Sequence, residues 1–105
     1  MRRGDIYRVQ LNPTAGSEIK KRRPCLILSP DELNISLRTV MIVPLTPQKR
    51  GWPFRPEVEA DSISGEVALD QLRVIDKSRC LSKAASLTDE ALADVLQVLT
   101  EMFAP

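Results

Sequence analysis

The stretch Lys20-Lys21-Arg22-Arg23-Pro24-Cys25-Leu26-Ile27-Leu28-Ser29-Pro30 leads from four consecutive cations directly into an apolar segment. Pro24 disfavours a helical backbone at Arg23 and favours an extended one. The apolar residues 25–28, closed by a Ser-Pro pair, are typical of a short buried strand. Arg23 is therefore expected where a basic loop meets a rigid strand. A guanidinium held there is a permanently charged donor fork that suits a phosphate.

The length of the chain favours one domain spanning residues 1–105, with a single modest core. Hydrophobic residues make up 43% and charged residues 28%, as in ordinary globular proteins. No apolar run approaches the roughly 20 residues that cross a bilayer, and no apolar signal segment follows the start. We therefore expect a cytoplasmic location and no membrane partner.

The residue types present limit the possible chemistry. The chain has no histidine, which excludes histidine metal sites and histidine-activated nucleophiles. It also has no Walker-type glycine loop and no strong carboxylate pattern for a metal, so neither a metal nor a cofactor is expected. Cys25 and Cys80 are the only cysteines; they are poor disulfide candidates, and Cys25 is expected to be a small buried hydrophobe.

The net charge of +1 hides an asymmetry along the chain. All fifteen Lys and Arg lie in residues 1–87 with ten acids, whereas residues 88–105 hold four acids and no base. A basic body suggests an anionic ligand on one face. The alternative is a solvated surface with helix-end charges.

Alternating and β-branched residues between turn signals predict a series of short strands. These strands cover residues 5–11, 24–28, 39–43, 55–60, 66–69 and 73–75, the last as an edge strand. In the first strand Tyr7, Val9 and Leu11 are expected to form the one buried face. Pro44 and Pro47 cannot donate to a ladder, so residues 44–48 are expected at a strand end or a sheet edge.

The C-terminal segment predicts a helix. Thr88 is a good N-cap, and Leu87 and Leu92 have the spacing of a hydrophobic staple. A stripe at helical spacing is expected to pack into the core. Its members are Leu92, Val95, Leu96, Leu99, Met102 and Phe103. Short strands followed by one helix predict a mainly β fold with α, either a small antiparallel barrel or a strongly curved sheet.

Several polar residues next to strands are candidate site residues, each with a purely structural alternative. Arg23 either binds a phosphate, or pairs with a carboxylate or lies in solvent. Thr46 either contributes to the same site or caps a turn. The basic loop of Lys49 and Arg50, with two aromatics, either contacts a nucleic acid or buries its rings. The trio Asp70, Gln71 and Arg73 either contacts a base edge or forms salt bridges.

Three ordered blocks of sequence resemble the MazF/PemK (Kid) family of toxin–antitoxin ribonucleases. The first runs from Arg3-Gly4-Asp5-Ile6-Tyr7 through residues 11–18 to Arg23-Pro24. The second is residues 43–54, and the third is residues 65–76. The resemblance implies an SH3-like, CcdB/PemK-type barrel of curved antiparallel sheet with a C-terminal helix, and a homodimer.

The resemblance also implies a function. Such toxins are sequence-specific, metal-independent endoribonucleases that cut single-stranded RNA, including mRNA, leaving 2′,3′-cyclic phosphate and 5′-hydroxyl ends. The family's catalytic Arg and Thr fall on Arg23 and Thr46. RNA-binding positions are placed on Glu18, Lys20, Lys21, Gln48, Lys49, Arg50, Asp70, Gln71 and Arg73. The implied partner is a MazE/PemI-type antitoxin, in a complex that binds DNA.

Two features depart from the family pattern, and two other functions compete. Residues 19–22 are more basic than expected, which bears on the target sequence, and Pro47 follows Thr46 where a small or hydroxyl residue is usual. The main alternative is a CcdB-like toxin of the same architecture that binds DNA gyrase without catalysis. A third is an inactive module that binds RNA or a protein partner.

Overall fold

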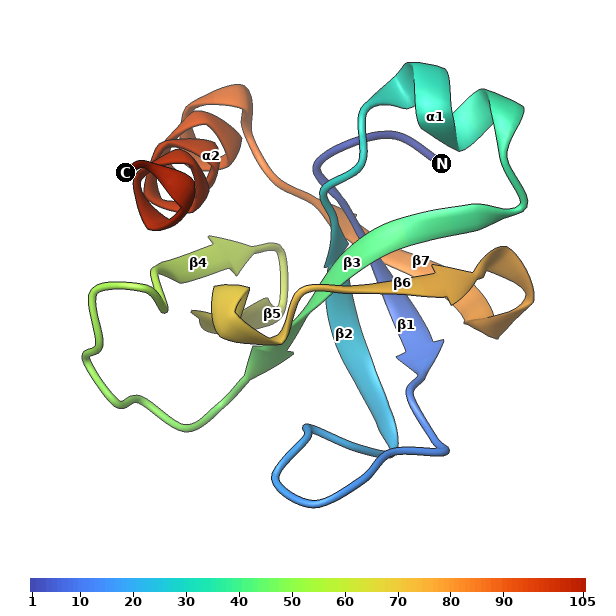
Figure 1. The fold of residues 1–105 in the computed structure, drawn as a ribbon, viewed down its shortest axis with the longest axis horizontal. Coiled ribbons are helices and arrows are strands. Elements are labelled where there is room, and N and C mark those ends of the chain that lie inside the picture. Colours follow the sequence, from blue (N-terminus) through green and yellow to red (C-terminus); the bar gives the residue numbers. More distant parts are fainter.

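Seven strands, two helices and two single 3-10 turns follow one another along residues 1–105, all of which the computed structural model describes (Figure 1). The strands are β1 (Asp5–Gln10), β2 (Arg22–Ile27), β3 (Thr39–Thr46), β4 (Glu57–Ala60), β5 (Ile63–Val67), β6 (Arg73–Asp76) and β7 (Cys80–Ser86). The helices are α1 (Asp31–Ser36) and α2 (Asp89–Phe103), and the 3-10 turns are η1 (Leu69–Gln71) and η2 (Lys77–Arg79). The strands form one curved antiparallel sheet in the order β4-β5-β3-β2-β1-β7, with β6 also paired to β3. The predicted mainly β fold with a C-terminal helix is confirmed.

Strand β3 is the centre of the sheet, and it changes partner along its length. Its first half pairs with β6 as far as Ile42, and its last two residues, from Leu45, pair with β5. Pro44 lies after the residues of β3 that pair with β6 and before those that pair with β5. Its missing N–H therefore removes no hydrogen bond from either the β3–β6 or the β3–β5 ladder. Strand β3 ends at Thr46, inside residues 44–48 as predicted, although Pro44 itself lies within the strand.

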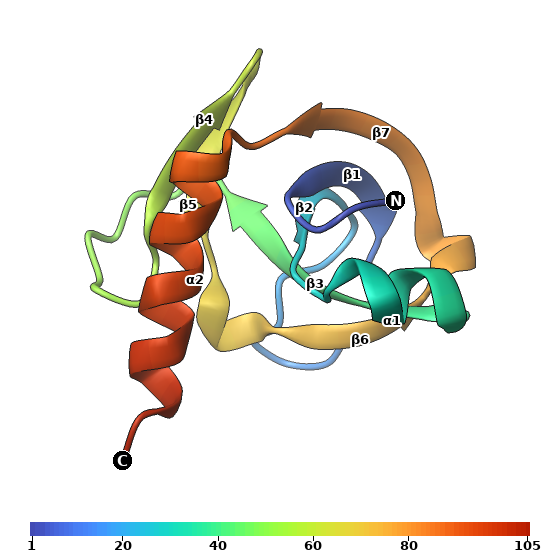
Figure 2. The same ribbon diagram turned by 90° about the horizontal axis from the view of Figure 1, so that it is seen from above.

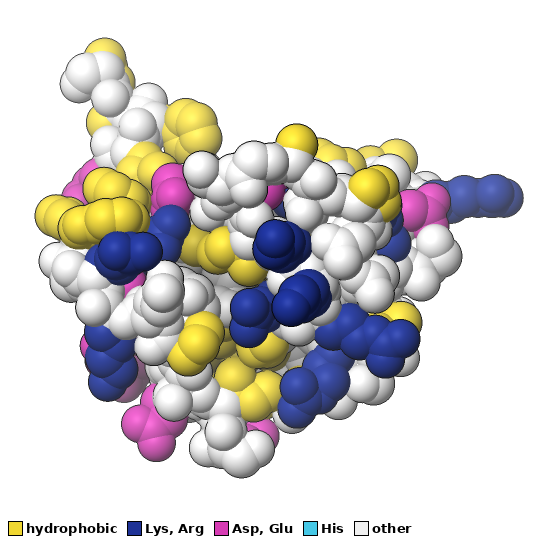
Figure 3. Space-filling model, turned by 90° about the horizontal axis from the view of Figure 1, so that it is seen from below, with side chains coloured by type: hydrophobic (Ala, Val, Ile, Leu, Met, Phe, Trp, Pro, Cys, Tyr) yellow, Lys and Arg dark blue, Asp and Glu magenta, His cyan; other side chains and the backbone are white.

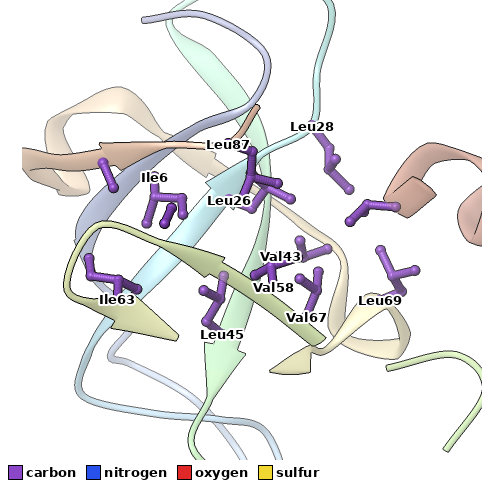
Figure 4. Close-up of a cluster of buried hydrophobic side chains, with 13 residues drawn as sticks. Ile6, Leu26, Leu28, Val43, Leu45, Val58, Ile63, Val67, Leu69 and Leu87 are labelled. Carbon is purple, nitrogen blue, oxygen red and sulfur yellow. The ribbon is translucent and has the colours of Figure 1, made fainter. Parts of the chain in front are cut away.

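Curling of the sheet buries two hydrophobic clusters. The larger, shown in Figure 4, includes Leu26, Val43 and Leu45 and also Ile6. The smaller lies on the opposite side of these strands and has seven buried members. They are Val9, Leu11, Cys25, Ile27, Val40, Ile42 and Ile75. The expectation that β1 buries only one face was wrong, because Ile6 is fully buried on the other.

Helix α2 covers the larger cluster and lies beside β4 and β5 (Figure 2). Thr88 caps it as predicted, with its hydroxyl oxygen accepting from the Ala91 N–H at 3.2 Å. Val95 is fully buried, but the expected apolar stripe ends early, since Met102 and Phe103 are 40% and 73% exposed. Met102 and Glu101 of the last turn line a shallow hollow with Pro53 and Phe54. Neither helix has the length and apolar character needed to cross a membrane.

The remaining strand predictions differ in detail from the structure. The edge strand predicted at residues 73–75 is confirmed as β6, which pairs only with β3. Strand β7 was not predicted, because Ala85 is its only buried residue and its sequence has no apolar alternation. Cys25 is buried as predicted, and this burial raises the pKa of its thiol to about 12.

Candidate active site

Arg23 and Thr46 approach each other at the ends of neighbouring strands. In the β2–β3 ladder Cys25 lies opposite Pro44. Continuing the same register by two residues places Arg23 opposite Thr46. Side chains alternate between the faces of a strand, so Arg23 shares the face of Cys25 and Thr46 shares that of Ile42, both members of the smaller cluster. The two predicted catalytic side chains therefore lie on one face, directly beyond the smaller cluster.

An open hollow of about 370 Å³ lies at this point. Its lining comes from the β1–β2 loop, from the start of β2 and from the end of β3. The lining residues are Ser17, Glu18, Ile19, Lys20, Arg23, Thr46, Pro47 and Gln48. The predicted catalytic pair thus shares one hollow with three of the predicted RNA-binding residues.

The polar atoms of the pair are available to a ligand. Arg23 is half-buried, forms no ion pair, and its Nε atom is buried without a hydrogen-bond partner. Thr46 is 8% exposed, and its hydroxyl oxygen accepts from the Gln48 N–H at 3.2 Å. Thr46 therefore does cap a turn, but its own O–H remains able to donate. Both side chains can offer hydrogen to an anion in the hollow.

A second hollow of about 200 Å³ adjoins the first and shares Glu18 and Ile19 with it. Asp70, Gln71 and Arg73 line it, so the predicted polar trio faces the same region. It is also lined by Leu11, Pro44 and Leu72. All three polar side chains already have partners within the protein.

The partners of this trio fix parts of the chain that are distant in sequence. Gln71 Oε1 accepts from the Ile19 N–H at 2.7 Å, and Arg73 Nη1 donates to the Leu11 carbonyl at 3.2 Å. Asp70 accepts two hydrogen bonds of 3.0 Å from Arg55. Of the salt bridges predicted as the alternative for this trio, only that of Asp70 forms, while Gln71 and Arg73 bond to backbone groups.

The β1–β2 loop that carries Lys20 and Lys21 is held by local contacts. Glu18 Oε1 accepts from the Ala15 N–H at 2.7 Å, and the Lys21 carbonyl accepts from the Leu11 N–H at 2.9 Å. Lys20 and Lys21 have exposed side chains, and Lys21 has a positive φ of 72°. The loop thus presents Lys20 at the lining of the hollow, with the exposed Lys21 next to it in the chain.

The loop between β3 and β4 is held by a carboxylate that the sequence did not single out. Glu66 is 1% exposed and accepts hydrogen bonds of 3.0–3.1 Å from the backbone N–H groups of Arg50 and Gly51. The Gly51 N–H and then the Arg50 N–H lower the pKa of Glu66. These contacts join residues 15 and 16 positions apart, a separation that leaves no local sequence pattern.

Aromatic and cationic side chains stack on the same loop. The guanidinium groups of Arg50 and Arg55 lie 5.2 and 4.8 Å from the Trp52 ring centroid, and the Phe54 ring lies 5.4 Å from it. Lys49 forms an exposed ion pair of 3.7 Å with Glu57. Trp52 is 41% exposed, so the loop offers both charge and an accessible aromatic ring.

Lys and Arg side chains gather on the face from which the β1–β2 loop projects (Figure 3). Arg79, which was not predicted, contributes to this region: its Nη1 donates to the carbonyls of Leu11 and Gln10 at 3.1 and 3.4 Å. The basic body inferred from the sequence is therefore concentrated around the site.

Comparison with known proteins agrees with this arrangement. Residues 2–103 match the family described as PemK-like, MazF-like toxin of type II toxin-antitoxin system. The chain is 33% identical to endoribonuclease EndoA of Bacillus subtilis over 94% of this chain and 90% of the relative. The crystal structure of MazF from Deinococcus radiodurans superposes with a TM-score of 0.87 at 31% identity, covering 97% of this chain and 94% of that one.

A structure of the MazE–MazF complex from the same organism also superposes, with a TM-score of 0.78 at 30% identity, covering 97% of this chain and 94% of that chain. The family match spans nearly the whole chain and includes every residue of both hollows. This chain belongs to the PemK-like, MazF-like toxins of type II toxin–antitoxin systems.

Proposed function

We propose that this protein is a sequence-specific, metal-independent endoribonuclease toxin that cuts single-stranded RNA, including mRNA, in the cytoplasm. The observation that carries the proposal is the juxtaposition of Arg23 and Thr46 in one open hollow, with unengaged donors on both. Relatives named as endoribonucleases support the same activity.

The reaction uses the RNA's own 2′-hydroxyl as the nucleophile. The 2′-oxygen forms a bond to phosphorus while the bond between phosphorus and the 5′-oxygen breaks. The 2′-hydroxyl loses its proton, and the leaving 5′-oxygen gains one. The products are a 2′,3′-cyclic phosphate and a 5′-hydroxyl. Negative charge grows on the phosphate oxygens in the transition state, so donors already fixed at that position lower the barrier.

Arg23 and Thr46 divide this task. The Arg23 guanidinium supplies a positive charge with directed N–H donors. Thr46 donates its O–H to the same phosphate, and its orientation is set by the Gln48 N–H that its oxygen accepts. The exposed cations Lys20, Lys21 and Lys49 would bind neighbouring phosphates. Glu18, Gln48, Arg50, Gln71 and Arg73 would line the path of the strand, with Asp70 beside them.

The test is incubation of the pure protein with a defined RNA transcript in EDTA, followed by analysis of the new ends. We expect cyclic-phosphate ends, and a decrease of about a hundredfold or more in Arg23→Ala and in Thr46→Ala. Arg38→Ala is the matched control, because this exposed arginine lies just before the opposite end of β3. Wild-type rates in both site variants would remove the assignment, and gyrase inhibition without cut ends would favour the CcdB-like alternative.

The proposed partners follow from the family and from the charge of the site. We infer a homodimer neutralised by a MazE/PemI-type antitoxin, as the Deinococcus complex suggests. An acidic disordered segment of the antitoxin would fold onto the basic face around Arg23. Salt-sensitive association of the two proteins is the expected signature.

A further inference from the structure

One short turn joins the two loops that border the proposed site. Asp70 and Gln71 are consecutive residues of η1, and each holds a different loop. Asp70 accepts hydrogen bonds from Arg55, which lies in the segment between β3 and β4. Gln71 accepts a hydrogen bond from the Ile19 N–H of the β1–β2 loop. We name these two contacts together the loop clamp.

The contact between Arg55 and Asp70, the first of the two in the loop clamp, is partly buried and bidentate. Arg55 has 9% of its side chain exposed and Asp70 has 34%, and their two parallel hydrogen bonds both measure 3.0 Å. The edge of the Arg55 guanidinium donates to Asp70, and its Cζ atom lies over the Trp52 ring at 4.8 Å from the centroid. Hydrogen bonding to Arg55 lowers the pKa of Asp70, so the pair is charged at neutral pH. A planar guanidinium held on two sides fixes the loop that carries it.

The second half of the loop clamp reaches a segment 52 positions away in the chain. Ile19 lines both hollows, and its neighbours Glu18 and Lys20 line the hollow of Arg23 and Thr46. The Gln71 carbonyl oxygen is the hydrogen-bond partner of the Ile19 N–H in the structure. The position of Glu18 and Lys20 relative to Thr46 therefore depends on the position of η1.

We infer that Arg55, Asp70 and Gln71 are positioning residues that set the width of the groove between the two loops. This inference rests on the proposed nuclease function, and it assigns a role to Arg55, which the sequence did not indicate. Asp70 acts through Arg55, because both of its carboxylate oxygens accept from that side chain. Gln71 acts through its carbonyl oxygen, which leaves its amide NH₂ free.

The decisive experiment is a double-mutant cycle. Arg55→Ala is expected to lower kcat by about ten- to a hundredfold, as small displacements of a site do. Adding Asp70→Ala to this variant should change kcat and the affinity for an uncleavable 2′-O-methyl RNA by less than about twofold. If Asp70 contacted RNA directly, its removal would weaken binding further in the Arg55→Ala background, and the inference would fail.

Two readouts need no RNA and separate this inference from the proposed function. Hydrogen exchange at the Ile19 amide should be several-fold faster in Arg55→Ala and in Gln71→Ala than in the wild type. Emission from Trp52, the only tryptophan, should change in Asp70→Asn, since the guanidinium on its ring is released. Unchanged exchange at Ile19 in Arg55→Ala would show that the loops are not linked.

Milder variants guard against general loss of folding. Arg55→Lys keeps the charge but not the bidentate geometry. It should lower kcat, but by less than Arg55→Ala does. Gln71→Glu keeps an oxygen acceptor for Ile19, so it should retain protection of that amide. Exchange at the Ile19 amide as fast as in Gln71→Ala would overturn the role given to Gln71. Arg2→Ala, at an exposed ion pair of 3.9 Å with Asp31, is the control.

Discussion

Thr46 and Glu66 lie directly opposite each other in the β3–β5 ladder. Paired residues of an antiparallel ladder project to the same side, so the buried Glu66 side chain lies on the same side of the sheet as that of Thr46. Glu66 also holds the Arg50 and Gly51 N–H groups, which fixes the turn that follows Thr46. One strand pair therefore sets both the position of the hydroxyl and the path of the basic loop.

Replacing Glu66 with Gln should loosen this turn. The neutral amide can satisfy fewer of the backbone donors and satisfies them more weakly than a carboxylate does. We expect kcat for RNA cleavage to decrease on the order of tenfold, by displacement of the loop. Glu59→Gln, at an exposed position of the neighbouring strand, is the control. Equal kcat in the two variants would contradict the role of Glu66.

Gly65 is required by the close approach of β5 to Thr46. A Cβ built on Gly65 would lie 2.7 Å from the Thr46 carbonyl oxygen, so the backbone would have to move. We expect Gly65→Ala to lower the free energy of unfolding by about 1–3 kcal/mol. Urea titration measures this change, and RNA cleavage by the folded fraction should also fall. Ser64→Ala, on the exposed neighbour, should alter neither quantity.

Acid should weaken the fold through Asp70 and Glu66. The pKa values of both carboxyls lie below their ordinary values of 3.8 and 4.5, because Arg55 and the Gly51 N–H, respectively, favour the charged forms. Such groups stabilise the protein fully above their unfolded-state pKa, and this contribution is lost as pH falls towards the folded pKa. Unfolding free energy measured at pH 7 and pH 3 should therefore fall less in the Asp70→Asn, Glu66→Gln double variant than in the wild type.

The two thiols should differ in reactivity. Cys25 is fully buried and its pKa is raised to about 12, whereas Cys80 is half-buried with a pKa raised to a smaller extent. The thiolate is the nucleophile that attacks an alkylating reagent, so native protein at pH 8 should be modified slowly at Cys80 and not at Cys25. Mass spectrometry of the labelled peptides distinguishes them. Labelling of Cys25 at the rate of Cys80 would contradict its burial.

Affinity for RNA should depend on salt through the lysines at the rim. Each phosphate contact on a single strand contributes about 0.7 to the slope of log K against log salt. Removing Lys20 and Lys21 together should therefore reduce the slope by roughly one unit or more. Fluorescence anisotropy with a 2′-O-methyl RNA at several salt concentrations measures the slope. Substituting Lys83, outside both hollows, should leave it unchanged.

Local sequence patterns predicted the parts of the fold that depend on neighbouring residues. The cap at Thr88 is set within a few positions and was predicted correctly, and a strand was predicted at residues 24–28, although β2 begins two residues earlier, at Arg22. Strand β7 has an exposed and polar sequence, and only its pairing with β1 makes it a strand. The exposure of Phe103 depends on where the sheet beneath α2 ends, which periodicity does not indicate.

In the candidate site, too, some residues could be predicted from the sequence and others depend on tertiary structure. The resemblance to the MazF/PemK family assigned Arg23 and Thr46 to the site, whereas their approach depends on the β2–β3 register. Arg55 and Glu66 act on partners 15 or 16 positions away, so nothing in their immediate sequence marks them. Residues that position a site are harder to find than the residues that form it, since their partners come from tertiary structure.

Because β3 contributes side chains to both hydrophobic clusters, the two cannot lose their packing independently. A substitution such as Ile42→Val, in the smaller cluster and on the strand that carries Thr46, should loosen the packing of β3 and can alter turnover while leaving the surface untouched. Variants of this toxin with graded potency are therefore obtainable from the interior of the protein alone, with every residue that meets the substrate kept intact.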